Sequence, residues 1–210
     1  MNLNVIKLTI DQLIKSGVHL GYTRWFLNSK MKPYLVGYKN SMIFINLYYT
    51  NIQLKMFINY LYNIIAFRHK VLIIKQYHPL NLNSIFYELN NVFFYQEKWT
   101  GGYLTNFKLV KRSVKRKLLN NNSLNFMKFM PSCVIILDAN ISNIALIEAL
   151  NLEIPVCSIL DTNSKYIQQV NYPIVGNNHS FEALCFYCYL FKNAILKGRK
   201  KECFNILNII

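Results

Sequence analysis

Short runs of hydrophobic residues alternate along this chain with longer amphipathic stretches. The runs are nearly continuous in Ile, Val, Leu and Phe, which is typical of strands that are buried on both faces of a parallel sheet. The alternation therefore predicts an α/β protein with a central parallel sheet and helices on both of its faces. The expected strands are residues 42–46, 70–75, 91–95, 133–138 and 156–161.

The stretches between these runs have the length and the polar starts of helices. Thr9, Thr50, Thr105 and Asn140 are suitable N-caps, because a side-chain oxygen can accept a backbone N–H of the first turn. The expected helices are residues 10–16, 51–67, 82–90, 106–119, 142–150 and 180–196.

The helix expected at residues 106–119 has two different faces. Phe107, Val110, Val114 and Leu118 follow one another at spacings of three and four and form one apolar side. The opposite side presents charge to its surroundings. Its basic residues are Lys108, Lys111, Arg112 and Lys115, and Arg116 follows in the same basic stretch.

The charge balance points to a polyanionic partner. The chain has 24 Lys and Arg against 9 Asp and Glu, which gives a net charge of +15, and such a surplus repels itself unless an anionic surface neutralises it. Nucleic acid is the first candidate. A membrane is the second, but the longest apolar run, residues 183–191, is far shorter than the roughly 20 residues that a spanning helix needs.

Signatures of catalysis are weak. Neither GxGxxG nor GxxxxGK[ST] occurs in the chain, and these are loops that hold phosphates on backbone N–H groups. Asp138 and Asp161 end two successive expected strands, where α/β proteins often bind ligands, and as a pair they could hold Mg²⁺ in a nucleotide- or magnesium-dependent enzyme. Side-chain turns at Asp138-Ala-Asn140 and Asp161-Thr-Asn are the stronger interpretation. His19 lacks a nucleophile at a recognisable spacing and is expected to be structural.

The cysteines predict neither disulfides nor a metal site. Five cysteines are an odd number, which favours reduced thiols, and Cys133 and Cys157 lie inside expected strands. Cys185 and Cys188 form a single CxxC with no second pair to complete a zinc site. We therefore expect no cofactor and no metal.

Basic residues gather in three stretches, two of which also carry aromatic rings or glycines. RNA-binding proteins use cations to contact phosphates and flat rings to stack on bases. Any single basic cluster is also compatible with a solvated surface of the protein. The first stretch contains Trp25, Tyr34 and Tyr38 with the cations Arg24, Lys30, Lys32 and Lys39; the second is residues 108–117; the third is residues 197–201 and includes Arg199 and Lys200.

Residue usage favours an organellar gene. Phe, Tyr, Met, Ile, Asn and Lys, whose codons are AT-rich, supply 106 of the 210 residues, whereas Gly, Ala, Arg and Pro supply 23. The first residues, MNLNVIKLTIDQ, have the character of neither a secretory signal nor a transit peptide. Together these features predict a protein made inside an organelle, with the mitochondrial matrix favoured and an AT-rich free-living microbe as the alternative.

Several segments, in order, resemble the S2 family of small-subunit ribosomal proteins. GVHLGY at residues 17–22 is similar to the family's GVHFGH, and KWTGGYLTNF at residues 98–107 to its RWLGGTLTNF. A strand ending at Asp138, a helix with Glu148-Ala149, and IPVCSILDTNS from Ile154 follow in the family's order. The remaining matches are KMKPYLVGYKN from Lys30, NYPIVGNN from Asn171 and AILKGR from Ala194.

The resemblance implies a flavodoxin-like sandwich with a five-stranded parallel sheet. It further implies a structural role in the small ribosomal subunit, bound to rRNA and neighbouring ribosomal proteins, without catalysis, membrane insertion or self-association. In the matched motifs, Trp25, Lys30, Lys32 and Pro33 fall in an rRNA-facing segment. The family's Gly-Gly loop corresponds to Trp99, Gly101, Gly102, Thr105 and Asn106.

The chain also departs from the family pattern. Tyr22 replaces the second His of GVHFGH, Asn28-Ser29 replaces the Asn-Pro of NPKM, and Asn171 and Asn178 replace two acids. The family's long coiled-coil hairpin is expected to be shortened within residues 105–130, because too little chain is present for two helices. We expect one domain at residues 1–200 and a C-terminal tail at residues 201–210.

Overall fold

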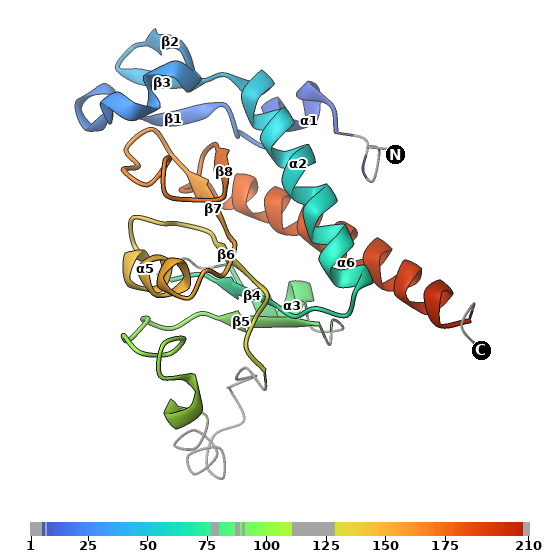
Figure 1. The fold of residues 1–210 in the computed structure, drawn as a ribbon. Coiled ribbons are helices and arrows are strands. Elements are labelled where there is room, and N and C mark those ends of the chain that lie inside the picture. Colours follow the sequence, from blue (N-terminus) through green and yellow to red (C-terminus); the bar gives the residue numbers. More distant parts are fainter. Residues whose placement is uncertain are drawn as a thin grey trace.

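The computed structural model describes residues 6, 8–76, 80–86, 89, 91–110 and 129–207. Two sheets lie within these ranges, one parallel with five strands and one antiparallel with three (Figure 1). The helices are α1 (Ile10–Lys15), α2 (Leu47–Ala66), α3 (Leu82–Phe86), α5 (Asn143–Asn151) and α6 (Phe181–Leu207), and the 3₁₀ segments are η1 (Arg24–Phe26) and η2 (Ser29–Tyr34). The strands are β1 (Leu20–Thr23), β2 (Leu35–Lys39), β3 (Met42–Ile45), β4 (Val71–Ile74), β5 (Val92–Tyr95), β6 (Cys133–Ile136), β7 (Val156–Leu160) and β8 (Tyr172–Val175).

The five-stranded sheet confirms the expected fold class. Its strand order is β5-β4-β6-β7-β8 and all four pairings are parallel. In chain order this is 2-1-3-4-5, the order of flavodoxin-like folds. The central strands β4, β6 and β7 are buried at every position, as their continuous apolar sequences predicted.

One expected strand belongs to the other sheet. The sequence predicts residues 42–46 as one of the parallel strands, but β3 at Met42–Ile45 pairs antiparallel with β1 and β2. The fifth parallel strand is β8, which was not predicted as a strand. β8 contains Pro173, and it lies at the sheet edge, where a residue without a backbone N–H is tolerated.

Each face of the parallel sheet packs against a separate apolar cluster. On one face, Val71, Ile73 and Ile135 lie in the cluster that contains the buried residues of α1, α2 and α6. On the other, Leu72, Ile136 and Leu160 lie with Leu146 of α5 and with Met31 of η2. Figure 1 shows α2 and α6 together on one side of the sheet and α5 on the other. The helices therefore cover both faces.

Two helix starts differ from those expected. Thr9 caps α1 in a capping box with Gln12, as predicted, but α2 begins earlier, with Asn46 as its N-cap. Thr50 instead donates from its hydroxyl to the Val175 carbonyl at 2.6 Å, which ties α2 to β8. The N-cap residue of α5 is Ser142, so Asn140 lies before the cap and does not cap the helix. Both errors arose where several polar residues near one helix start were equally suitable.

Helix α6 is longer than expected and packs closely on α2. It continues to Leu207 rather than ending at residue 196. A Cβ at Gly198 would lie 2.8 Å from the Tyr62 carbonyl oxygen and 3.0 Å from Ile65 Cβ. The absence of a side chain at Gly198 therefore allows the two helix backbones to approach each other.

Several sequence-based expectations concern the thiols and the segment that follows residue 110. Cys133 and Cys157 are fully buried free thiols, as predicted.

Residues 107–110 are helical, but residues 111–128, with Lys111, Arg112, Lys115, Arg116 and most of the shortened hairpin, lie outside the described residues. In the part of the chain that is described, no helix has the length and hydropathy needed to cross a membrane.

Candidate RNA interface

The small antiparallel sheet is built around a tight hairpin. β2 and β3 are joined by Asn40 and Ser41, and Lys39 pairs with Met42. Both loop residues have positive φ, 49° and 65°, as a two-residue type I′ turn requires, and Asn tolerates this conformation better than most residues. The Ser41 carbonyl accepts the N–H of Arg24 at 2.9 Å. The hairpin tip is thus held against η1.

Cations and aromatic rings cover the outer surface of this sheet and of the two 3₁₀ segments. Trp25 is 90% exposed, an unusual state for so large an apolar side chain. The Arg24 guanidinium lies over the Tyr38 ring, 4.2 Å from its centroid, a distance typical of cation–π contacts. We call this surface the hairpin face; its exposed members are Arg24, Trp25, Phe26, Lys30, Lys32, Val36, Tyr38, Lys39, Asn40 and Ser41.

The hairpin face contains a pocket. Its volume is about 630 Å³, and Arg24, Trp25, Tyr38, Asn40 and Ser41 line it. Pockets of about 300–1,000 Å³ hold small molecules in proteins. The sequence grouped Arg24, Trp25 and Tyr38 in one basic and aromatic stretch, and in the fold Tyr38 of β2 lies against Arg24 of η1.

The part of the sequence that forms the hairpin face contains no acidic residue. No Asp or Glu occurs between Asp11 and Glu88, a stretch that includes both sheet strands of the hairpin, η1, η2 and α2. Cations in this stretch are therefore not neutralised by any neighbour in sequence. An unbalanced positive surface with rings on it attracts a polyanion that has flat groups.

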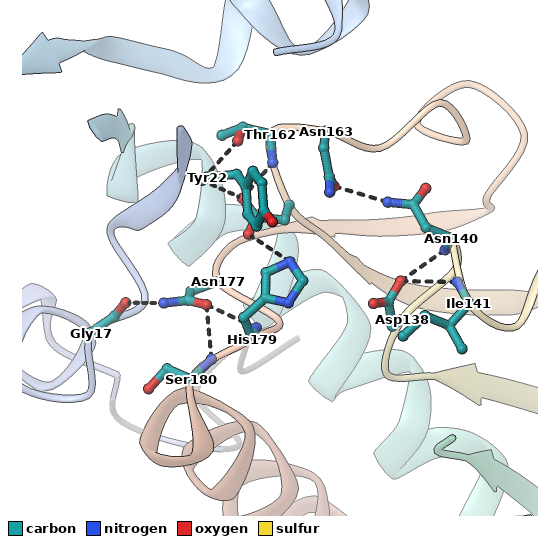
Figure 2. A network of polar contacts seen from close by, with 11 residues as sticks. Gly17, Tyr22, Asp138, Asn140, Ile141, Thr162, Asn163, Asn177, His179 and Ser180 are labelled. Atoms are coloured by element: carbon teal, nitrogen blue, oxygen red, sulfur yellow. Dashed lines mark hydrogen bonds and ion pairs between the residues drawn. The ribbon is translucent and has the colours of Figure 1, made fainter. Parts of the chain in front are cut away.

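A polar network fastens the antiparallel sheet to the carboxyl edge of the parallel sheet. The Tyr22 N–H donates to Thr162 Oγ1 at 3.0 Å and to Asp161 Oδ1 at 3.2 Å (Figure 2). The Asn28 N–H donates to the Thr162 carbonyl at 3.0 Å. Asn177 donates from its amide to the Gly17 carbonyl at 3.2 Å. The loops after β7 and β8 thus position the hairpin face.

Gly21 is required for this contact. A Cβ at Gly21 would lie 2.5 Å from Thr162 Cγ2 and 3.2 Å from the Ile43 carbonyl oxygen. Thr162 is fully buried, so it cannot turn away easily. The second glycine of GVHLGY is explained by this close packing. His19 of the same motif stacks on Phe44, as expected for a structural histidine.

The carboxylates of Asp138 and Asp161, the candidate catalytic pair, accept backbone N–H groups. Asp138 Oδ1 accepts the N–H groups of Asn140 at 2.8 Å and Ile141 at 3.3 Å, the turn chemistry that the sequence favoured. Asp161 Oδ1 accepts the N–H of Thr162 at 2.5 Å, and its Oδ2 lies 3.7 Å from His179 Nε2. Among the described residues, no group of three His, Cys, Asp or Glu side chains is arranged to hold a metal ion.

Titration of Asp161 should be visible in the stability of the fold. Burial raises the pKa of this carboxyl above its ordinary value of 3.8, although the N–H groups of Thr162 and Tyr22 and the nearby His179 oppose that effect. A raised pKa in the folded state means that Asp161 favours folding below pH 3.8 and that this contribution is lost as the pH rises through the folded-state pKa.

The variant Asp161→Asn keeps an acceptor oxygen but cannot ionise. We expect the unfolding free energy of the variant, relative to wild type, to increase as the pH is raised from about 4 to about 7. Urea unfolding at a series of pH values measures this difference. A difference that stays constant over the range would show that ionisation of Asp161 does not weaken the fold.

The Gly-Gly loop is organised by one buried carboxylate. Glu148 of α5 is 6% exposed. Its Oε1 accepts the Trp99 indole N–H at 3.2 Å and the Gly102 N–H at 2.7 Å. Its Oε2 accepts the N–H groups of Leu104 at 2.9 Å and Thr105 at 3.3 Å. One side chain therefore fixes the path of the whole loop.

The predicted site residues of this loop fall into two groups. Trp99 is 3% exposed and packs between the rings of Tyr95 and Tyr103, so its side chain supports the loop from within. Gly101, Thr105, Asn106 and Lys108 are exposed. Gly102 has φ +94°, a conformation that suits glycine. The Asn106 carbonyl accepts the Val110 N–H at 3.0 Å, which starts the helical residues.

Arg199 and Lys200 lie apart from the other predicted residues. They belong to α6, which covers one face of the parallel sheet, whereas the Gly-Gly loop and Met31 of η2 pack on the other.

The sequence did not assign functions to Glu148, Thr162 or Asn177, which position the two exposed surfaces. An acid inside the apolar stretch IALIEALN was the available signal for Glu148, because a buried charge needs partners.

Comparison with known proteins places this arrangement in a family. The family model described as Ribosomal protein S2 matches residues 13–124 and 119–198. The chain is 34% identical over 237 residues to small ribosomal subunit protein uS2 of Buchnera aphidicola subsp. Cinara cedri, with 92% of this chain and 98% of that protein covered. It is 30% identical to the uS2 proteins of Ehrlichia chaffeensis and Pseudoalteromonas atlantica, covering 79% and 93% of their lengths.

Proposed function

The chain belongs to the ribosomal protein S2 family, and from this premise we propose how it takes its place in the small ribosomal subunit. It is a structural component of that subunit in translation and not an enzyme. The hairpin face binds small-subunit rRNA, with Arg24, Lys30, Lys32 and Lys39 on phosphates and Trp25 against the RNA. The observation that carries this proposal is the absence of acids between Asp11 and Glu88, which leaves the positive charge of this stretch unbalanced in sequence. Lys and Arg that neutralise phosphates supply much of the affinity for RNA.

The Gly-Gly loop makes a second contact. Gly101 and Gly102 let the backbone approach another chain closely, and Thr105, Asn106 and Lys108 stand exposed beside them. Trp99 contributes by holding the loop from inside. Lys111, Arg112, Lys115 and Arg116 extend this contact along the chain, while Arg199 and Lys200 meet a different part of the rRNA or a neighbouring ribosomal protein.

Sedimentation tests whether the chain is part of the subunit. A lysate is run on sucrose gradients at low and at high Mg²⁺, where ribosomal subunits separate and join, and each fraction is probed for the chain. We expect it with the small subunit at low Mg²⁺ and with whole ribosomes at high Mg²⁺. A chain that stays at the top of both gradients would contradict the proposed function.

Removing charge from the hairpin face should weaken rRNA binding and its dependence on salt. For Lys32→Gln combined with Lys39→Gln, we expect the slope of log K against log salt to become shallower by about 1–2, because each lost phosphate contact removes about 0.7–0.9. Filter binding to in vitro transcribed small-subunit rRNA measures the slope. Lys15→Gln with Lys55→Gln removes the same charge from exposed positions of α1 and α2 and should change the slope less.

We also propose that the chain works in the ribosome of the mitochondrial matrix and is encoded in the organelle genome. The support is the residue usage, in which amino acids with AT-rich codons supply half of the chain. The gradient described above, applied separately to purified mitochondria and to the remaining cell lysate, tests the location. Recovery of the chain only in ribosomes outside the organelle would contradict it.

A further inference from the structure

The pocket on the hairpin face has the chemistry of a nucleobase site. We propose that it holds one unpaired nucleotide of the rRNA, with the base stacked on Trp25 and the neighbouring phosphates met by Arg24 and Lys39. The inference rests on the proposed function and adds the form of RNA that this face selects, a single-stranded or extruded base rather than a duplex.

The residues that line the pocket include aromatic rings and a cation. Trp25 is 90% exposed and lines the pocket, so its indole is open for stacking. The guanidinium of Arg24, which also lines the pocket, lies over the Tyr38 ring, 4.2 Å from its centroid. Arginine planes and aromatic rings are the groups on which unstacked RNA bases lie.

The pocket also has hydrogen-bonding groups in its lining. Asn40 and Ser41 line it, and the Asn40 amide offers both a donor and an acceptor to a base edge. Both residues belong to the tight turn between β2 and β3, and the bond from the Arg24 N–H to the Ser41 carbonyl fixes this turn against η1. A preformed site of this kind binds without the cost of ordering a loop.

Charge favours RNA over a protein as the occupant. Arg24 lines the pocket and Lys39 precedes the lining residue Asn40, while no acid occurs between residues 12 and 87. An unbalanced positive surface of this kind attracts a polyanion such as RNA. A duplex is disfavoured as well, because its bases are stacked inside and present no free π-face to Trp25.

Intrinsic fluorescence provides a direct test with the full-length protein. The chain has two tryptophans, of which Trp99 is 3% and Trp25 is 90% exposed, so a stacked base should quench the emission of Trp25 and leave Trp99 largely unchanged. The probes are a mixed-sequence RNA decamer as a single strand and the same decamer as a duplex. We expect quenching with the single strand and little with the duplex.

Three variants decide the outcome. Trp25→Ala should bind the single strand about 5- to 100-fold more weakly, since one stacked base is worth about that factor, and Trp25→Phe should retain part of the affinity. Phe67→Ala, which removes another exposed ring at the end of α2, should bind as wild type does. Equal single-strand binding by Trp25→Ala and wild type, or a preference of wild type for the duplex, would overturn the proposal.

The same measurements separate this proposal from the proposed function. If Trp25→Ala leaves binding unchanged while Lys32→Gln with Lys39→Gln weakens it, the face binds RNA without a base in the pocket. If neither variant changes binding to decamers or to rRNA, the hairpin face is not the RNA interface at all.

Discussion

Glu148→Gln should lower the unfolding free energy by about 2–4 kcal/mol, because a charged acceptor is lost and buried donors are left without one. The carboxylate accepts four hydrogen bonds from Trp99, Gly102, Leu104 and Thr105. A glutamine of the same size has one accepting oxygen, so two of these N–H groups would face an amide NH₂. Urea unfolding, followed by circular dichroism, measures the loss.

A second consequence should appear at the Gly-Gly loop itself. Because Trp99 donates to Glu148, its emission should change in the folded state of Glu148→Gln. Glu153→Gln, an exposed acid just beyond α5, is the matched control and should leave stability within about 0.5 kcal/mol of wild type. A Glu148→Gln protein as stable as this control would show that the carboxylate does not organise the loop.

Gly198→Ala should destabilise the protein although alanine favours helices. In an isolated helix the change would gain up to about 1 kcal/mol. Here the new Cβ would lie 2.8 Å from the Tyr62 carbonyl oxygen, so α6 and α2 must separate. Overpacking of this kind typically costs about 1–3 kcal/mol, and we expect a net loss of about 1–2 kcal/mol.

Gly37→Ala provides the control for this prediction. Gly37 lies in β2, and a Cβ there would meet no atom within 4 Å, so the same substitution creates no clash. Urea unfolding of both variants gives the comparison. A Gly198→Ala variant that is more stable than wild type would mean that helix propensity outweighs the contact between α2 and α6.

The parallel sheet was predictable because burial leaves a simple mark in the sequence. β4, β6 and β7 are buried at every position, and so their sequences are apolar without alternation. β1 and β2 were missed because they contain Gly21 and Gly37 and bury few of their residues. The Asn40-Ser41 turn was the available signal for a hairpin.

The residues that position the exposed surfaces were harder to predict. Thr50 resembles a helix cap in sequence, but its hydroxyl donates a hydrogen bond to the carbonyl of Val175 in β8. No local sequence pattern encodes this tertiary contact. Asp161 and Thr162 were recognised as turn residues, yet their bonds to Tyr22 join segments 139 and 140 residues apart. The sequence therefore identified the basic and aromatic stretch. It did not show that the turn residues Asn40 and Ser41 line a pocket with this stretch, or that the loop after β7 holds the sheet in position.

Lysine footprinting of assembled small subunits tests most directly whether the hairpin face is the RNA interface. Acetylation of Lys30, Lys32 and Lys39 is compared by mass spectrometry in the free protein, in the intact subunit and in the subunit after ribonuclease treatment. We expect all three to be protected in the intact subunit and to regain reactivity when the RNA is digested. Equal reactivity in the free protein and the intact subunit, or protection that survives digestion, would contradict the account.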